Sequence, residues 1–217
     1  MNEKNFYKTF WNTYIQIENE LIDIFKYVEL STDNYKTYSS KFLKVFLQIG
    51  SEIDICFKEY LKLFQSNSAS SIGEYKQQLQ NYDVDFFDES IEIKQLKTIV
   101  KPWEELKNNN TISWWTAYNK VKHERTNQVT INMVTQEAYK FADLENVIIS
   151  LSGLYVLLMN IFAKIKNNRE DSPIPNSKLF NMKSKRWGKC KYFNTIYAFT
   201  SDNGNIYFDN TINYLMY

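Results

Sequence analysis

The chain has little of the residues on which most familiar enzyme classes depend. Its 217 residues include one histidine, His123, two cysteines, Cys56 and Cys190, five glycines and three prolines. This scarcity argues against a metal site, a disulfide framework, a dinucleotide-binding glycine loop and a phosphate-binding Gly-Lys-Ser/Thr loop. We therefore expect no metal and no cofactor. Two widely separated cysteines fit a reducing compartment, and we expect a cytoplasmic protein.

An excess of one charge is also missing. The net charge is +1, so the chain as a whole has no field that would attract nucleic acid. Residues 1–4 do not predict a signal peptide. Residues 146–163 carry no charge and approach the length of a membrane span, but Asn146, Ser150 and Asn160 interrupt the run. This stretch continues an amphipathic pattern, which predicts a buried helix and no membrane partner.

Aromatic residues, by contrast, are dense: 16 tyrosines, 15 phenylalanines and five tryptophans. Such a composition favours a large aromatic core. Stacking platforms for nucleic-acid bases are the alternative use of the same residues.

Apolar residues recur at three- and four-residue steps along most of the chain, which predicts α-helices. We expect long helices over residues 4–29, 39–64 and 135–167, and shorter ones over 74–80, over 102–106 and through 114–125. Thr111 or Ser113 is expected to cap the last of these. Residues 90–94 alternate as a brief strand would, although a loop is equally compatible. The predicted fold class is mainly α, a helical bundle with a small β-containing extension.

That extension is expected after Asn167, where the composition changes. Residues 171–176, with two prolines, predict a linker or a corner, and residues 195–200 and 205–208 are aromatic and β-branched around Asn203-Gly204. Asn-Gly between two such runs predicts a β-hairpin. The expected domains are therefore a helical bundle over 1–170 and a basic, aromatic extension over 171–217.

The candidate site lies in the predicted helix that contains the only histidine. At 100° per residue, Trp114, Ala117, Tyr118 and Val121 cluster on a core-facing side, and Trp115 joins a neighbouring side. That neighbouring side carries three polar residues: Asn119, Lys122 and His123. An imidazole there could transfer a proton to or from a ribose, while the amide and ammonium hold a phosphate.

This segment resembles the signature helix of HEPN proteins, a superfamily of helical bundles with many bacterial toxin and antiphage ribonucleases. The HEPN motif is an arginine, a polar residue that is often asparagine, three further residues and a histidine. Asn119 and His123 match the polar residue, the spacing and the histidine, but the arginine position holds Tyr118. Lys120, Lys122 or Arg125 could supply the missing charge, without the planar fork of arginine.

A second point of similarity is the acidic segment Ser51-Glu52-Ile53-Asp54 on an earlier predicted helix. In this interpretation Glu52 or Asp54 supports the site by orienting His123 or pairing with Lys122 or Arg125. A solvated helix face is the ordinary alternative for either acid. The HEPN resemblance implies metal-independent RNA cleavage by the 2′-hydroxyl and a homodimer whose protomers share the active site.

The C-terminal segment adds a second candidate surface. No acid occurs between Ser172 and Ser201, whereas six basic residues alternate with Trp187, Tyr192 and Phe193. Cations and rings mixed in this way suit RNA binding, and equally suit docking on an acidic protein surface. The residues assigned to substrate binding here are Lys185, Arg186 and Lys189.

Two functional hypotheses follow from these observations. The first is an intracellular HEPN-like protein that binds RNA and could cleave it in a toxin or defence role. The second is a non-catalytic HEPN-like module that binds a protein such as a cognate antitoxin. Tyr118 favours the second, whereas Asn119, His123 and the basic segment favour the first.

Overall fold

The protein is mainly α-helical. The computed structural model describes residues 1–66, 68–109, 111–187, 197–200 and 206–209. The helices are α1 (Glu3–Phe6), α2 (Asn12–Ile24), α3 (Ser40–Lys62), α4 (Ile72–Tyr82), α5 (Glu104–Asn108), α6 (Ser113–His123) and α7 (Leu144–Lys166). A π-helical turn at Tyr7–Trp11 joins α1 to α2, and 3-10 turns lie at Thr32–Asn34, Val84–Asp88 and Ala138–Phe141.

The strands are short and antiparallel. They are β1 (Ile91–Ile93), β2 (Thr98–Val100), β3 (Gln128–Ile131), β4 (Val134–Glu137), β5 (Phe180–Met182), β6 (Tyr197–Thr200) and β7 (Ile206–Asp209). They form one three-stranded sheet in the order β2-β1-β5 and the two hairpins β3-β4 and β6-β7. The strand alternative for residues 90–94 and the C-terminal hairpin are thereby confirmed, whereas the Asn203-Gly204 turn lies outside the described residues.

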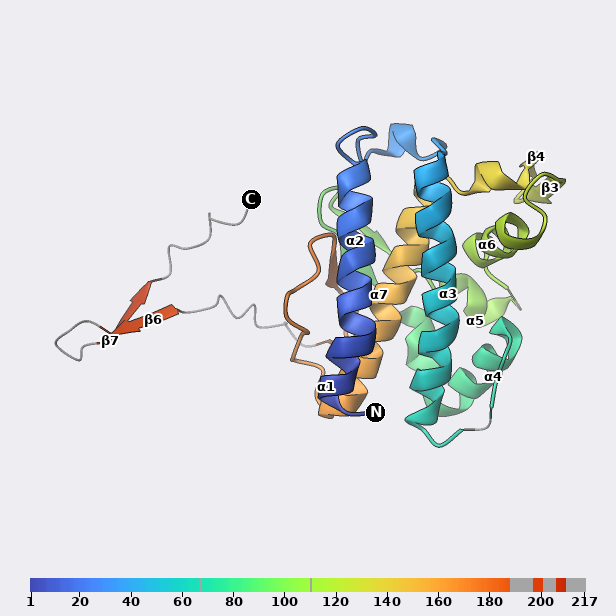
Figure 1. Cartoon of the computed structure of the whole chain (residues 1–217). Helices are drawn as coiled ribbons and strands as arrows, with labels where there is room; N and C mark the ends of the chain where they lie inside the picture. Colours follow the sequence, from blue (N-terminus) through green and yellow to red (C-terminus); the bar gives the residue numbers. More distant parts are fainter. Residues whose placement is uncertain (67, 110, 188–196, 201–205, 210–217) are drawn as a thin grey trace.

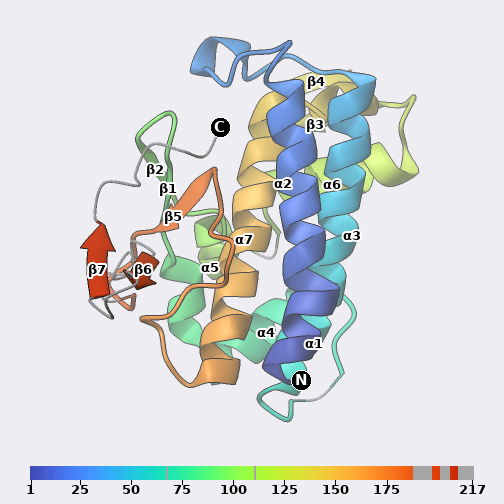
Figure 2. The same cartoon turned by 60° about the vertical axis from the view of Figure 1, so that its left-hand side comes forward.

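Helix α7 lies at the centre of the molecule. Figure 1 shows α2, α7 and α3 side by side, with α6 beyond α3, and Figure 2 shows the three-stranded sheet on the other side of α7. Every residue of α7 from Ser150 to Ala163 is buried. Its most apolar window has a mean hydropathy of 1.8, sufficient for a membrane span, but 89% of that window is buried within the protein. This agrees with the expected buried helix.

The long helices begin at residues that cap them. Ser39 accepts a hydrogen bond from the Phe42 amide at 3.1 Å, and Ser71 accepts one from the Glu74 amide at 3.3 Å. Asp143 does the same for α7 by accepting from the Asn146 amide at 2.9 Å. These bonds satisfy amides that have no partner inside the helix. At its other end α7 stops at Asn167, which adopts a left-handed conformation with φ of 50°.

Two glycines allow aromatic rings to approach helix backbones closely. A Cβ on Gly50 of α3 would lie 2.2 Å from the Tyr118 ring, so α6 packs on α3 with that ring over the glycine. A Cβ on Gly153 of α7 would lie 3.2 Å from the Trp103 ring, whose indole nitrogen donates to the Gly153 carbonyl at 3.1 Å. These contacts fix α6, and the residues before α5, against the two central helices.

The expected helix over residues 135–167 is wrong in its first part. Residues 134–137 form β4 and residues 138–141 a 3-10 turn, so α7 begins only at Leu144. The cause is a tight turn between β3 and β4, where Asn132 and Met133 both have positive φ, 50° and 65°. Such a turn matches the twist of a hairpin, and Met133 gives no sequence signal for it. The hydroxyls of Thr130 and Thr135 also meet across the hairpin at 2.8 Å.

Two other expected boundaries differ from the structure. The helix expected over residues 4–29 is α1, the π-helical turn and α2, and it ends at Ile24. The domain boundary at residue 171 does not separate the segment that follows, because β5 pairs with β1, and Leu179 and Trp187 are buried in the common core. After the proline corner at 171–176, the described residues 177–187 therefore pack against the helical part.

A matched pair of glycine substitutions tests the packing of α6 on α3. Gly50→Ala should lower the free energy of unfolding by about 2 kcal/mol, because the added methyl overlaps the Tyr118 ring. Gly73→Ala lies in α4 with nothing within 4 Å of the new methyl, and should be neutral or stabilise by up to about 1 kcal/mol. Urea denaturation measures both, and equal effects would contradict the close contact.

Candidate functional site

Helix α6 presents its two faces as the sequence predicts. Trp114, Tyr118 and Val121 are buried, whereas His123 is exposed at the last residue of the helix. Trp115 is an exception to the expected division, since only 7% of it is exposed and its ring packs between those of Trp114 and Tyr118. The exposed side of α6 is therefore narrower than expected and purely polar.

The polar residues at the end of α6 form what we call the His123 surface, comprising Asn119, Lys122, His123 and Arg125. Lys122 and Arg125 are exposed, and Asn119 is half-buried one turn before His123. Among the described residues, none donates to or accepts from the side chains of Asn119, His123 or Arg125. These groups are therefore free to meet a ligand. Lys120, in contrast, is held by Glu124 at 2.6 Å, and that hydrogen bond lowers the pKa of the glutamate.

Tyr118 occupies the position of the motif arginine and belongs to the core. Its ring lies over Gly50, makes an edge contact with Phe46 and is only 4% exposed. The Lys122 ammonium lies 5.6 Å from the centroid of this ring, which places one cation at the border between core and surface. Charge at the His123 surface therefore comes from Lys122 and Arg125.

The two acids proposed to support the site do not meet it. Asp54 accepts a hydrogen bond from the Tyr75 hydroxyl and pairs with Lys58, each at 2.5 Å, so it faces α4. Glu52 is half-buried, and desolvation raises its pKa, but it forms no hydrogen bond or ion pair with His123. Tyr118 of α6 meets α3 at Phe46 and Gly50, and among the described residues no hydrogen bond or ion pair joins either acid to the His123 surface.

The basic C-terminal residues lie apart from the His123 surface. Arg186 is paired with Asp83 at 2.7 Å and with the buried Glu89 at 3.3 Å, and Trp187 donates to Glu89 at 2.8 Å. This part of the segment docks on an acidic surface, as in the alternative interpretation. Lys185 is exposed beside a hollow of about 450 Å³, and Lys189 lies outside the described residues.

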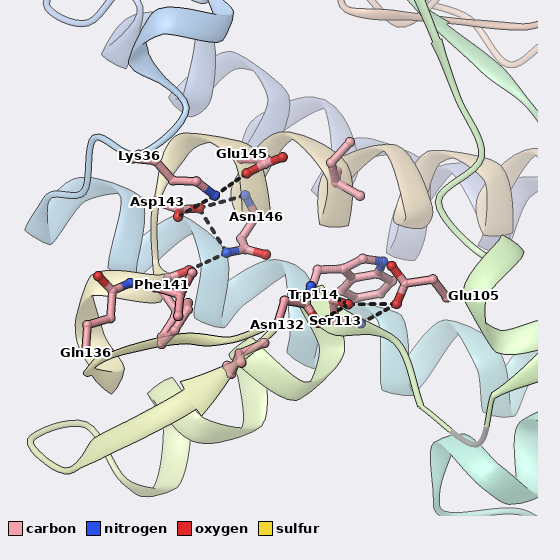
Figure 3. Close-up of a pocket in the computed structure, with 13 residues that line it drawn as sticks. Lys36, Glu105, Ser113, Trp114, Asn132, Gln136, Phe141, Asp143, Glu145 and Asn146 are labelled. Atoms are coloured by element: carbon pink, nitrogen blue, oxygen red, sulfur yellow. Dashed lines mark hydrogen bonds and ion pairs between the residues drawn. The ribbon is translucent and has the colours of Figure 1, made fainter.

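Sequence reasoning missed a second hollow, of about 380 Å³, near the start of α7 (Figure 3). It lies where the first turn of α6, the β3-β4 hairpin and the first turn of α7 meet. Its wall includes apolar side chains from Trp114, Phe141 and Ile149. Its polar lining comprises Lys36, Glu105, Ser113, Asn132, Gln136, Asp143, Glu145 and Asn146.

Asp143 is the unusual group of this hollow. Only 2% of the residue is exposed, and burial raises the pKa of its carboxyl to about 6. Its cap hydrogen bonds and the Lys36 ammonium, 3.9 Å away, oppose this effect without cancelling it. Sequence could have suggested the residue as a helix cap, but not its burial or the hollow.

The start of α6 is capped differently from our expectation. Neither Thr111 nor Ser113 accepts a hydrogen bond from an amide of the first turn, and the residue that precedes the helix is Ile112. Instead the Glu105 carboxylate of α5 accepts from both the amide and the hydroxyl of Ser113, each at 2.8 Å. An acid near the positive end of a helix is favourable, which explains the replacement.

Comparison with known proteins adds no relative. No protein-family model matches the sequence, and no curated protein and no solved structure matches the chain. The function must therefore be argued from the residues and their geometry.

Asp143→Asn should make the protein more stable at neutral pH. The folded-state pKa of about 6 exceeds the ordinary 3.8, so folding favours the protonated carboxyl, and stability falls as pH rises between those values. The difference corresponds to about 3 kcal/mol at pH 7, and asparagine keeps the cap. Thermal unfolding from pH 3.5 to 8 should show the variant gaining its advantage above pH 4. A constant difference at every pH would contradict this.

Tyr118→Arg, which restores the family motif, should destabilise the fold by about 3 kcal/mol or more, because it places a charge against Gly50 and Phe46. Tyr118→Phe keeps the ring and should cost less than about 1 kcal/mol, since the hydroxyl has no hydrogen-bond partner among the described residues. Urea denaturation separates the two. An arginine variant as stable as wild type would show that position 118 can face the solvent.

Proposed function

We propose that the protein is a HEPN-like helical bundle that binds RNA at the His123 surface and cleaves it without a metal. The observation that carries this proposal is the exposed imidazole of His123, with no hydrogen-bonding partner among the described residues, one turn after Asn119 and beside Lys122 and Arg125. A histidine that makes no hydrogen bond within the described residues and has two cations near it in sequence suits proton transfer at a phosphate.

The proposed reaction uses the 2′-hydroxyl of the RNA as its nucleophile. The O2′–P bond forms as the P–O5′ bond breaks, giving a 2′,3′-cyclic phosphate and a 5′-hydroxyl. One proton leaves the 2′-hydroxyl and one reaches the departing O5′, and His123 can serve either transfer. Lys122 and Arg125 would neutralise the phosphate, and Asn119 would orient it.

A homodimer is part of this proposal. The His123 surface is open, since no described element covers His123 or Arg125. Two copies that meet at this surface would supply one imidazole for each proton transfer and exclude water from the phosphate. The resemblance to HEPN proteins supports the same arrangement.

The second candidate function is a non-catalytic module that binds a protein such as a cognate antitoxin. The burial of Tyr118 over Gly50 favours it, because no arginine can reach the phosphate from that position without leaving the core. The two candidates differ in whether His123 is needed for a chemical step.

His123→Ala should reduce RNA cleavage by about 100-fold or more in buffer that contains a chelator, since general acid–base catalysis contributes this much. Asn119→Ala should have a smaller effect. Thr126→Ala is the matched control, because Thr126 is also exposed just after α6 but has no chemical role. Gel analysis of single-stranded and structured RNAs measures cleavage, and thermal unfolding confirms that each variant is folded.

Three outcomes would count against the proposed ribonuclease. Wild-type protein that cleaves none of these RNAs would favour the non-catalytic module. Cleavage that persists in His123→Ala would show that another residue transfers the proton. Cleavage that stops when the chelator is added would contradict a metal-independent reaction.

A further inference from the structure

The hollow at the start of α7 has the size and lining of a small-molecule site. Its volume of about 380 Å³ lies within the range of such sites, and an apolar wall faces convergent polar groups. In Figure 3, Lys36, Asp143, Glu145 and Asn146 gather on one side, while Trp114, Ser113 and Glu105 lie on the other. The His123 surface is at the opposite end of α6, so this hollow is a separate feature.

The net negative charge of the residues that line the hollow favours a positively charged ligand. Glu105, Asp143 and Glu145 contribute three carboxylates, whereas Lys36 is the one cation among the lining residues. Lys36 pairs with Glu145 and also lies 3.9 Å from Oδ2 of Asp143, so a single cation faces three carboxylates in the lining. A surplus of negative charge in a concave site repels phosphates and carboxylates and attracts cations.

One carboxylate oxygen in the hollow lacks a donor. Oδ1 of Asp143 accepts from both the amide and the side-chain nitrogen of Asn146, each at 2.9 Å. Oδ2 accepts no hydrogen bond from any described residue, and its nearest cation, the Lys36 ammonium, lies 3.9 Å away. Because no described residue donates to this oxygen, a charged donor that entered the hollow could form a hydrogen bond with it.

We propose that this hollow binds a small organic cation, an amidinium or a primary ammonium attached to an aromatic or apolar body. The charged head group donates to Oδ2 of Asp143, and the body lies against the wall that contains Trp114 and Phe141. The exposed, flexible Lys36 side chain moves aside toward Glu145, with which it already pairs. This site does not depend on RNA binding or cleavage at His123.

Isothermal titration of the full chain at pH 8, where the Asp143 carboxyl is ionised, tests the proposal. Benzamidine and phenethylamine are the cationic ligands, benzamide is the neutral analogue and benzoate the anionic one. Wild-type protein should bind both cations at least about 10-fold more tightly than benzamide, as expected for a hydrogen bond to a charged group. Benzoate should not bind.

Asp143→Asn is the decisive variant, because asparagine preserves the helix cap while removing the charge. It should weaken the binding of both cations by about 10-fold or more, with its fold confirmed by thermal unfolding. Glu20→Gln is the matched control, since Glu20 pairs with Lys44 on the surface and does not line the hollow. It should leave the affinities unchanged.

The proposal is overturned if neither cation binds wild-type protein, if benzamide or benzoate binds as well as benzamidine, or if Asp143→Asn binds both cations as tightly as wild type does. None of these outcomes bears on the ribonuclease proposal, because its readout is RNA cleavage and its residues lie at the other end of α6.

Discussion

The apolar surface of α7 is the constraint on which the rest of the fold depends. A helix that is apolar on all sides must be covered on all sides, and every residue of α7 from Ser150 to Ala163 is buried. Helices α2, α3 and α6 and the three-stranded sheet all contact or surround it. The chain returns after the proline corner and completes this cover, with the ring of Phe180 tilted against that of Tyr155 of α7 at 5.7 Å between centroids. The arrangement of the remaining elements follows from this single demand.

The position of α6 also follows from the need to bury the apolar surface of α7. Trp103 donates to the Gly153 carbonyl of α7, Trp114 packs against Trp103, and Tyr118 rests on Gly50 of α3. These three aromatic contacts hold the first two turns of α6, and at the end of the helix Lys122 and His123 are exposed. The hollow beside Trp114 and the His123 surface therefore lie at opposite ends of one helix that is held firmly by the core. Such a helix is a better support for a site than a mobile loop.

The sequence predicts what depends on local periodicity. The bounds of α3 and the burial of Trp114, Tyr118 and Val121 follow from apolar residues at helical spacing. It does not predict the β3-β4 hairpin, because the turn requires a positive φ at Met133, a residue type that rarely adopts it. The Asp143-Leu144-Glu145-Asn146 sequence could have located the start of α7, since aspartate is a favoured cap and acids favour the first turn.

What depends on distant residues could not be predicted from the sequence. Arg186 lies in a basic, aromatic segment typical of RNA binding, yet it forms ion pairs with Asp83 and Glu89, about a hundred positions earlier. Asp54 has the spacing of a supporting acid, yet its carboxylate accepts a hydrogen bond from the hydroxyl of Tyr75 in the next helix. The hollow near α7 combines residues from five separate stretches of chain. In each case the partner, and not the residue itself, decides the role.

The three buried carboxylates among the described residues show how the partners of a residue determine its role. Glu18 accepts from the Tyr14 hydroxyl and from the Lys178 and Leu179 amides, so its charge fastens the C-terminal segment to α2. Glu89 faces Arg169, Arg186 and Trp187 and fastens the same segment at a second point. The charges of both acids therefore interact with groups of the protein itself.

Asp143 differs from these two acids in one respect. It caps α7 with one oxygen, and its other oxygen borders a hollow without a hydrogen-bond donor. Neither Glu18 nor Glu89 adjoins that hollow, and Oε1 of Glu89, which also accepts no hydrogen bond, faces Arg169 and Arg186 of the protein itself. An uncharged asparagine would cap the helix equally well without the cost of burying a charge. The carboxylate adds to the lining of the hollow a negative charge that asparagine would not, and the proposed cation site depends on this charge.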